Sequence, residues 1–299
     1  MTKIPLMPLP IAMAEIQTLT VTSSDHHRFD ATLYPTADPG APVLIFLSAL
    51  GTPSRVYARF GREMVKHGIQ VCAPDWRGMA SSSIRAGRGS DFGYRHLVEF
   101  DLTALIQAVR QALPDAPIWL GGHSLGGQLS LLSAAAHPES LSGVVLIASG
   151  SVHLPCYSWK LRLGIGSLAL ISHLTGPLLG YFPGSWMSFG GREAAGLMRD
   201  WSRVAITGQY RPDGSDIDYE TALRSLKLPV LALTFAADYW SPKQAARSLL
   251  NKLPPNTFIH WHWDKSDTAG VAVDHYAWIK QPALVAPAVA QHIRGLTPA

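Results

Sequence analysis

Short apolar runs alternate with amphipathic segments along most of the chain. The runs that predict buried strands lie at 43–47, 69–73, 118–120, 141–148 and 230–235, and a further strand is predicted at 258–263. Apolar residues at helical spacing fall between them, at 56–67, 96–113, 128–136, 242–250 and 282–293. Before the first run, residues 16–22 and 28–34 have the pattern of two strands joined by a polar turn, which predicts a hairpin. Strands that alternate with helices predict the α/β class, with a mostly parallel central sheet flanked by helices on both faces.

The alternation stops between residues 151 and 226, where the chain is rich in Gly, Trp, Phe and Leu and shows no strand pattern. We therefore divide the chain into a core of residues 1–150 and 227–299 and an inserted helical lid of residues 151–226. An insertion at this place is expected to lie over the carboxyl ends of the strands, the edge at which ligands bind in open sheets.

The insertion contains a long apolar stretch at 161–182. Arg162, His173 and Pro177 interrupt it, whereas a transmembrane helix needs about twenty predominantly apolar residues. We expect a helix pair that covers a pocket, and no stable insertion into a membrane.

Composition and charge narrow the function classes. The 299 residues are 47% hydrophobic and 15% charged, which is typical of a globular chain with a large core. The formal net charge is +4, but Lys and Arg are scattered without a basic run, so nucleic-acid binding is not expected. The two cysteines, Cys72 and Cys156, provide no disulfide framework, which favours a reducing, cytoplasmic location.

The first residues loosely resemble a secretory signal, with Lys3, an apolar stretch and small residues at 12–14. Three prolines at positions 5, 8 and 10 interrupt the apolar region, so we do not expect export.

The most informative motif is Gly122-His123-Ser124-Leu125-Gly126, which has the form G-x-S-x-G between a predicted strand and a predicted helix. In that context the motif predicts a nucleophile elbow, a tight turn that exposes a strained serine. The two glycines stand where a Cβ would collide with the neighbouring strand or helix. The alternative is a chance match on an ordinary turn.

A serine nucleophile needs a base, and the base needs an acid to orient it. In folds of this kind the chain order is serine, acid, histidine. Asp238 directly follows the strand predicted at 230–235, and its side chain should therefore point to the edge where ligands bind. The alternative for Asp238 is a turn aspartate.

Three histidines follow Asp238. His275 lies in a loop before the last helix, while His260 and His262 alternate within the strand predicted at 258–263. A loop at the active edge suits a general base better than a mid-strand position, so we favour His275. Asp274 is a rival orienting acid, but neighbouring side chains usually diverge.

Acyl transfer also needs donors for the oxyanion. We expect the backbone N–H groups of Leu125, after the nucleophile, and of Leu50, in the loop 48–53 after an earlier strand. His123 is expected to pack beneath the turn, and His26 and His27 to be exposed. We find no convincing metal-ligand spacing and no dinucleotide fingerprint, so no cofactor or metal is expected.

With these motifs in place, the chain resembles the α/β-hydrolase superfamily over nearly its whole length. The resemblance is carried by the elbow at Ser124, the Asp238 loop ending in Pro242, the His275 loop, and Asp75–Ser82, which is similar to D-x-R-G-x-G-x-S with Ala80 in place of glycine. Ser48-Ala49 stand where many members have His-Gly, which leaves the oxyanion donor less defined. A serine nucleophile argues against the haloalkane dehalogenase and epoxide hydrolase branches.

The resemblance implies a serine hydrolase that cleaves an ester or thioester through Ser124, His275 and Asp238. Large apolar side chains in the lid, together with Trp240, favour a small-molecule substrate with an apolar acyl or alcohol group of medium length. The lid residues are Trp159, Phe182, Trp186, Phe189 and Trp201, of which Trp159 and Trp186 are the expected substrate contacts. The alternative for these side chains is packing of the lid onto the sheet. Two other functions stay open: an acyltransferase with the same triad, and a binding protein without catalysis. The pattern does not predict an oligomeric state.

Overall fold

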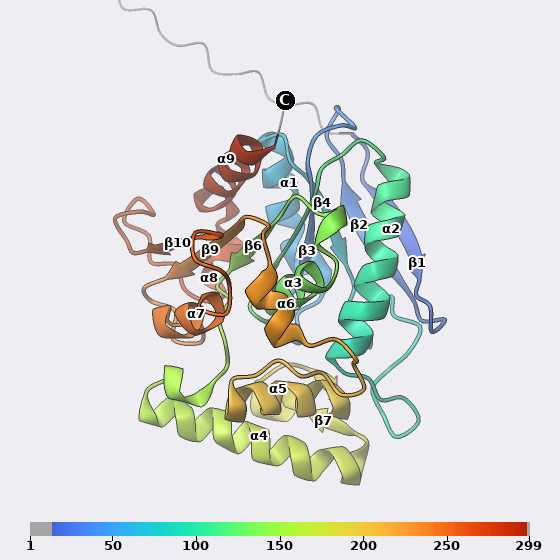
Figure 1. Ribbon diagram of the computed structural model, residues 1–299, viewed down its shortest axis with the longest axis vertical. Coiled ribbons are helices and arrows are strands. Elements are labelled where there is room, and N and C mark those ends of the chain that lie inside the picture. The colour runs from blue at the N-terminus through green and yellow to red at the C-terminus, as the bar shows by residue number, and fades with distance from the viewer. Residues whose placement is uncertain (1–13, 298–299) are drawn as a thin grey trace, which may run out of the picture.

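The computed structural model describes residues 14–297. Its central sheet consists of β1 (Gln17–Thr22), β2 (Arg28–Tyr34), β3 (Val43–Leu47), β4 (Gln70–Pro74), β5 (Ile118–His123), β6 (Gly143–Ile147), β9 (Val230–Phe235) and β10 (Phe258–Trp263). These strands follow one another in space as β1-β2-β4-β3-β5-β6-β9-β10 (Figure 1). β2 pairs antiparallel with β1 and with β4, and the other neighbours are parallel. The predicted α/β architecture is confirmed.

The sheet divides the hydrophobic core into two clusters. Along β3, Val43, Ile45 and Leu47 belong to one cluster, while Leu44 and Phe46 belong to the other. Because both faces are covered, every position of the strand is buried, which explains its continuous apolar run. The cluster of Val43 is shared with α2 (Leu102–Ala112), α3 (Leu125–Ala136), α6 (Tyr219–Ser225) and α7 (Lys243–Leu250), and that of Leu44 with α1 (Ala58–Lys66), α8 (Ala277–Lys280) and α9 (Ala286–Leu296).

The inserted segment, residues 151–226, follows β6. It contains α4 (Trp159–Leu179), β7 (Tyr181–Pro183), β8 (Arg192–Ala194), α5 (Ala195–Thr207) and finally α6. In Figure 1, α4, α5 and β7 lie together at one end of the molecule, with α5 between α4 and the core. α6 packs against α3 on the face of the sheet instead.

Two expectations for the inserted segment were wrong. Within the stretch 161–182, residues 161–179 belong to one helix rather than a pair, and α4 packs against α5 from later in the chain. Pro177 is tolerated inside α4, which ends at Gly180 in the left-handed conformation with φ 79°. The absence of strands was also mispredicted, because β7 and β8 form a small antiparallel pair. Three-residue strands are too short to show an alternating pattern.

Outside the inserted segment, the structure differs from the sequence predictions only locally. His27 is buried rather than exposed, because its two ring nitrogens contact Asp101 and Ser82 at 3.0 and 2.8 Å. Cys72 lies in the core as expected, and burial raises the pKa of its thiol to about 12. The signal-like pattern in residues 1–13 lies outside the described residues. Across residues 14–297, no helix is long and apolar enough to cross a membrane.

Candidate active site

Ser124 stands at a sharp turn between β5 and α3. Its backbone has φ 54° and ψ −120°, a region that non-glycine residues rarely adopt and that costs about 1–3 kcal/mol. The turn is held in place by its own backbone: Ser124 N donates to Ile147 O at 3.1 Å, and Ser124 O accepts from Gly127 N at 3.1 Å and from Ser149 Oγ at 2.7 Å. The strained conformation is therefore fixed from β6, from Ser149 just after it, and from the helix.

The glycines on either side of the turn have no room for a side chain. A Cβ on Gly122 would lie 2.4 Å from the carbonyl carbon of Gly126, and a Cβ on Gly126 would lie 2.4 Å from the carbonyl oxygen of Leu47. The first turn of α3 thus packs directly on the backbone of β5 and on the end of β3. This close approach is the physical reason for the G-x-S-x-G spacing.

Asp238 and His275 form a buried pair at the ends of later elements. Asp238 follows β9, and its Oδ1 accepts from the backbone nitrogens of Trp240 and Ser241, both at 2.8 Å. Its Oδ2 accepts from His275 Nδ1, also at 2.8 Å. With Nδ1 donating to the carboxylate, His275 keeps Nε2 available as a proton acceptor.

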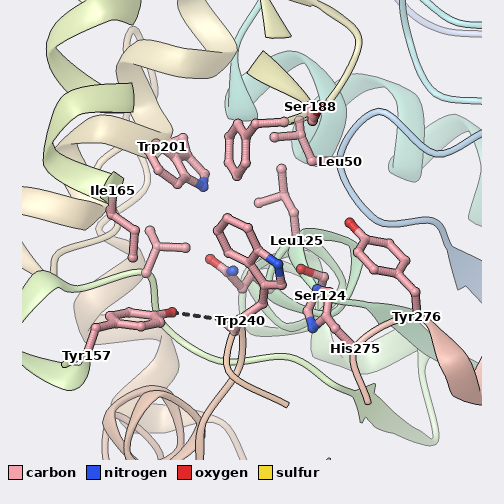
Figure 2. A pocket seen from close by; sticks show the side chains of 14 residues that line it. Leu50, Ser124, Leu125, Tyr157, Ile165, Ser188, Trp201, Trp240, His275 and Tyr276 are labelled. Atoms are coloured by element: carbon pink, nitrogen blue, oxygen red, sulfur yellow. Dashed lines mark hydrogen bonds between the residues drawn. The ribbon is translucent and has the colours of Figure 1, made fainter. Parts of the chain in front are cut away.

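Ser124 and His275 line the same pocket, and Figure 2 shows them next to each other on its wall. The structure therefore places Ser124 and His275 on the wall of one pocket, with Asp238 hydrogen-bonded to His275. A serine hydroxyl beside an oriented imidazole can be activated as a nucleophile.

The rival acid and the rival histidines have other partners. Asp274 Oδ1 accepts from Tyr276 N at 3.0 Å and from Ala277 N at 2.8 Å, so its carboxylate holds the start of α8. His260 and His262 both contact Thr234 Oγ1, at 2.8 and 2.9 Å, and neither lines the pocket. Burial, followed by the neighbouring His262, lowers the pKa of His260 to about 4.

His123 packs against the ring of His275. It is fully buried, its ring lies 4.7 Å from that of His275, and its Nδ1 accepts from Tyr57 Oη at 2.7 Å. Burial, with the nearby His275, holds the pKa of His123 well below its usual range, so the ring stays neutral. The expected packing role fits this position. No motif pointed to Tyr57, which lies in the stretch predicted as an ordinary helix.

The two expected oxyanion donors, Leu50 and Leu125, both line the pocket. Leu125 opens α3, where the first N–H groups have no acceptor within the helix and the helix dipole is positive. In the loop 48–53, the residue before Leu50 is Ala49. Its backbone N–H already has an acceptor, since it donates to Tyr57 Oη at 3.1 Å. Leu50 is therefore the next backbone donor along that loop.

The pocket is closed by side chains from the inserted segment. Its walls include Leu50, Leu125, Val152, Tyr157, Ile165, Phe189, Trp201, Trp240 and Tyr276, and its volume is about 90 Å³ (Figure 2). Tyr157 Oη lies 3.1 Å from the carbonyl oxygens of Ser151 and Trp240, so it ties the inserted segment to the loop that carries Asp238.

The aromatic contacts expected from the sequence divide into two groups. Trp240 and Trp201 line the pocket, whereas Trp159 and Trp186 do not. The expectation that Trp159 and Trp186 contact substrate is corrected, because their side chains are 68% and 76% exposed on the outside of the segment. Tyr157 and Ile165 take part instead. Nothing in the apolar pattern of the segment distinguishes inward from outward positions.

Gln128 is a polar residue that sequence reasoning missed. It is buried, lines the pocket, and lies one helical turn after Ser124. Its Oε1 accepts from Tyr210 Oη at 2.9 Å, so the amide nitrogen is the part left to donate. The i, i+4 spacing from Ser124 is the signal that could have found it, because such residues share one face of a helix.

A strained serine between a central strand and a helix of a mostly parallel sheet defines the α/β-hydrolase class. Residues 42–167 match the family model described as alpha/beta hydrolase fold. The chain has the α/β-hydrolase fold, and the family match covers less than half of its length.

The chain is similar to several known hydrolases. It is 33% identical to human monoglyceride lipase over 115 residues, which cover 38% of this chain and 36% of that protein. It is 28% identical to the pimeloyl-(acyl-carrier protein) methyl ester esterase of Vibrio campbellii, over 63% of this chain and 79% of that protein. The match to the monoglyceride lipase thus spans little more than a third of its length. The monoacylglycerol lipase of Paleococcus ferrophilus shares the fold, with a TM-score of 0.59 at 15% identity, covering 95% of this chain and all of that chain.

Proposed function

We propose that the protein is a serine hydrolase that cleaves carboxylic ester or thioester bonds of a small, mainly apolar substrate. The observation that carries the proposal is the buried Asp238–His275 hydrogen bond of 2.8 Å, with His275 on the wall of the same pocket as the strained Ser124. Ester hydrolysis by the named relatives supports the reaction class.

In the proposed mechanism Ser124 Oγ attacks the acyl carbonyl while His275 Nε2 takes its proton. Asp238 keeps Nδ1 protonated and stabilises the imidazolium. The N–H groups of Leu50 and Leu125 bind the oxyanion. His275 then protonates the leaving group, and water activated by the same histidine releases the acid from the acyl-enzyme.

The walls of the pocket favour apolar groups, and its volume of about 90 Å³ admits only a small one. A medium-length acyl chain would require the inserted segment to move, so we assign residues 151–226 the role of a lid.

Within the wall, the Gln128 amide is a fixed donor that an apolar chain cannot satisfy, and leaving it unpaired costs about 1–3 kcal/mol. The substrate we propose therefore carries a hydrogen-bond acceptor, such as a carbonyl or hydroxyl oxygen, one helical turn away from the scissile carbonyl. We also propose a cytoplasmic location, because the cysteines are free rather than joined in a disulfide.

A fluorophosphonate probe and a series of p-nitrophenyl esters test the assignment. We expect the wild-type protein to be labelled and to hydrolyse the short esters, and Ser124→Ala to lose both, with a rate lower by about 10⁴-fold or more. Ser167→Ala, at an exposed serine of α4, serves as the matched control.

Hydrolysis by Ser124→Ala at the wild-type rate would contradict the proposal, provided both variants unfold at the same temperature. Ester turnover that yields a transfer product with an added alcohol faster than the free acid would favour the acyltransferase alternative.

A further inference from the structure

The outward face of α4 carries a row of large apolar side chains that the fold leaves uncovered. Trp159, Leu163, Leu170, Leu174 and Leu178 are each between 57% and 68% exposed. Single exposed apolar residues are normal on a protein surface, but a contiguous group marks an interaction site.

These five positions form one stripe. At about 100° per residue they fall within an arc of about 100°, and the stripe is about 30 Å long. The residues of α4 that the fold buries, Ile165, Ala169, Ser172 and Gly176, lie on the opposite side of the helix. α4 therefore has two apolar faces, and packing on α5 and the pocket uses only one of them. We call the exposed one the α4 stripe.

The charge around the α4 stripe is positive. Residues 151–192 contain no Asp or Glu, while Lys160 and Arg162 lie at the start of α4. Arg88 reaches the other end of the helix, where its guanidinium donates to Leu178 O at 2.6 Å. Within residues 14–297, none of these three cations has a carboxylate within 4.0 Å.

We propose that the α4 stripe docks the protein reversibly on an anionic lipid surface, with α4 lying parallel to that surface. An interfacial helix buries an apolar face in the boundary between headgroups and acyl chains while basic residues face anionic headgroups. Each basic residue near such a surface contributes about 1 kcal/mol.

A tryptophan at the start of the helix fits this position. Trp159 is an amphipathic side chain of the kind enriched at membrane–water interfaces, and the Lys160 ammonium lies 5.6 Å from its ring centroid. Trp186, from the same inserted segment, is also exposed.

A second copy of the chain fits the α4 stripe less well. In a two-fold symmetric contact the same stripe meets itself, in parallel or antiparallel sense. Because both ends of α4 are basic, either sense brings like charges together without a carboxylate to offset them. Lipid phosphates supply the missing opposite charge.

Docking would connect the lipid surface with the pocket through a single helix. Ile165 on the inner face of α4 lines the pocket, while Leu163 and Leu170 on the outer face would enter the lipid. The proposal concerns binding alone and does not depend on the catalytic roles of Ser124 and His275.

Flotation with large unilamellar vesicles tests the proposal. One set of vesicles is phosphatidylcholine alone, and the other contains in addition about a third phosphatidylglycerol. We expect the wild-type protein to float with the anionic vesicles, and Leu170→Glu/Leu174→Glu to lose at least about tenfold in partitioning. Lys160→Gln/Arg162→Gln should remove the preference for anionic vesicles.

The matched control is Ile259→Glu/Leu296→Glu, which changes two exposed apolar residues on β10 and α9. It should float like the wild type. All three double variants should keep the thermal unfolding temperature within a few degrees and hydrolyse a soluble ester at the wild-type rate. Ser124→Ala should still float, which separates failure of docking from failure of the catalytic proposal.

The proposal is overturned if wild-type protein floats with neither set of vesicles, or if Leu170→Glu/Leu174→Glu floats as well as the wild type. A concentration-dependent dimer in light scattering, abolished by the same pair of changes, would assign the α4 stripe to a second copy instead.

Discussion

The elbow at Ser124 and the helix α4 obey opposite packing rules. At the elbow a Cβ on Gly126 would meet backbone at 2.4 Å, whereas Cβ atoms on Gly164 or Gly166 of α4 would meet nothing within 4 Å. Asp238 has each carboxylate oxygen engaged, whereas Leu163 and Leu170 face solvent. The elbow and the Asp238 carboxylate are thus held by close contacts on every side, whereas the outer face of α4 has room for other side chains.

The difference follows from what each region must do. In the proposed mechanism, proton transfer between Ser124 and His275 needs stable geometry, which strand ends and supporting contacts such as Tyr57–His123 can supply. A lid over the pocket, the role proposed for the inserted segment, would have to move to admit substrate.

The largest effect is expected when the proposed general base, which belongs to the core, is replaced. His275→Gln removes the proposed base, and we expect kcat for a p-nitrophenyl ester to fall by about 10³-fold or more. His260→Gln is the matched control, because His260 contacts Thr234 and does not line the pocket. We expect its rate to stay within about twofold. A large loss in His260→Gln with retained activity in His275→Gln would reverse the assignment.

The packing contrast itself can be measured with one chemical change at two sites. Gly126→Ala forces a methyl group against the Leu47 and Ser48 carbonyl oxygens, and we expect it to lower the free energy of unfolding by about 3 kcal/mol. Gly166→Ala adds the same methyl group in open space within a helix, where alanine is favoured by about 0.5–1 kcal/mol. Urea unfolding followed by circular dichroism gives both values. Equal effects at the two sites would remove the contrast.

A smaller effect is expected where the two regions meet in the pocket. Gln128→Met keeps the length of the side chain but removes its donor, and we expect KM to rise about tenfold for esters that carry a second oxygen acceptor. KM for simple alkyl esters should change by less than about twofold. Gln128→Glu, which keeps the acceptor for Tyr210 Oη and loses the donor, should behave like Gln128→Met. Gln107→Met on α2 is the control. An equal rise in KM for both kinds of ester would show a packing effect alone.

The smallest effect is expected on the outer surface of the inserted segment. Trp159→Ala and Trp186→Ala should leave kcat/KM for a soluble ester within about twofold of the wild type, because neither side chain lines the pocket. Steady-state kinetics with p-nitrophenyl butyrate measures this. A tenfold loss in either variant would restore the original expectation that these tryptophans contact substrate.

The sequence predicted the core well because its pattern is local. The strands at 43–47 and 230–235 have the predicted bounds, since a strand covered on both faces is a continuous apolar run. The strand at 258–263 also has the predicted bounds, although it lies at the edge of the sheet and is only partly buried. Parallel strands all deliver their carboxyl ends to one edge, so the order of Ser124, Asp238 and His275 along the chain was enough to predict that they meet.

The inserted segment was predicted less well because its apolar residues carry no directional signal. Trp159 and Trp201 are the same residue type in the same stretch, yet one is exposed and the other lines the pocket. Which side of α4 faces inward depends on its packing against α5, a tertiary contact that a single sequence does not encode locally. The buried His27 was missed for the same reason, since its partner Asp101 is 74 positions away.

The connection after β6 has a consequence for how such a protein can change over generations. The segment departs from the core after β6 and rejoins it at α6, which only residues 226–229 separate from β9. Drift or recombination between these two points can replace the whole cover while the strand order and the residues at Ser124, Asp238 and His275 stay in place. The residues proposed to carry out the reaction and the part of the pocket wall that the inserted segment contributes are thus encoded on separate stretches of one chain.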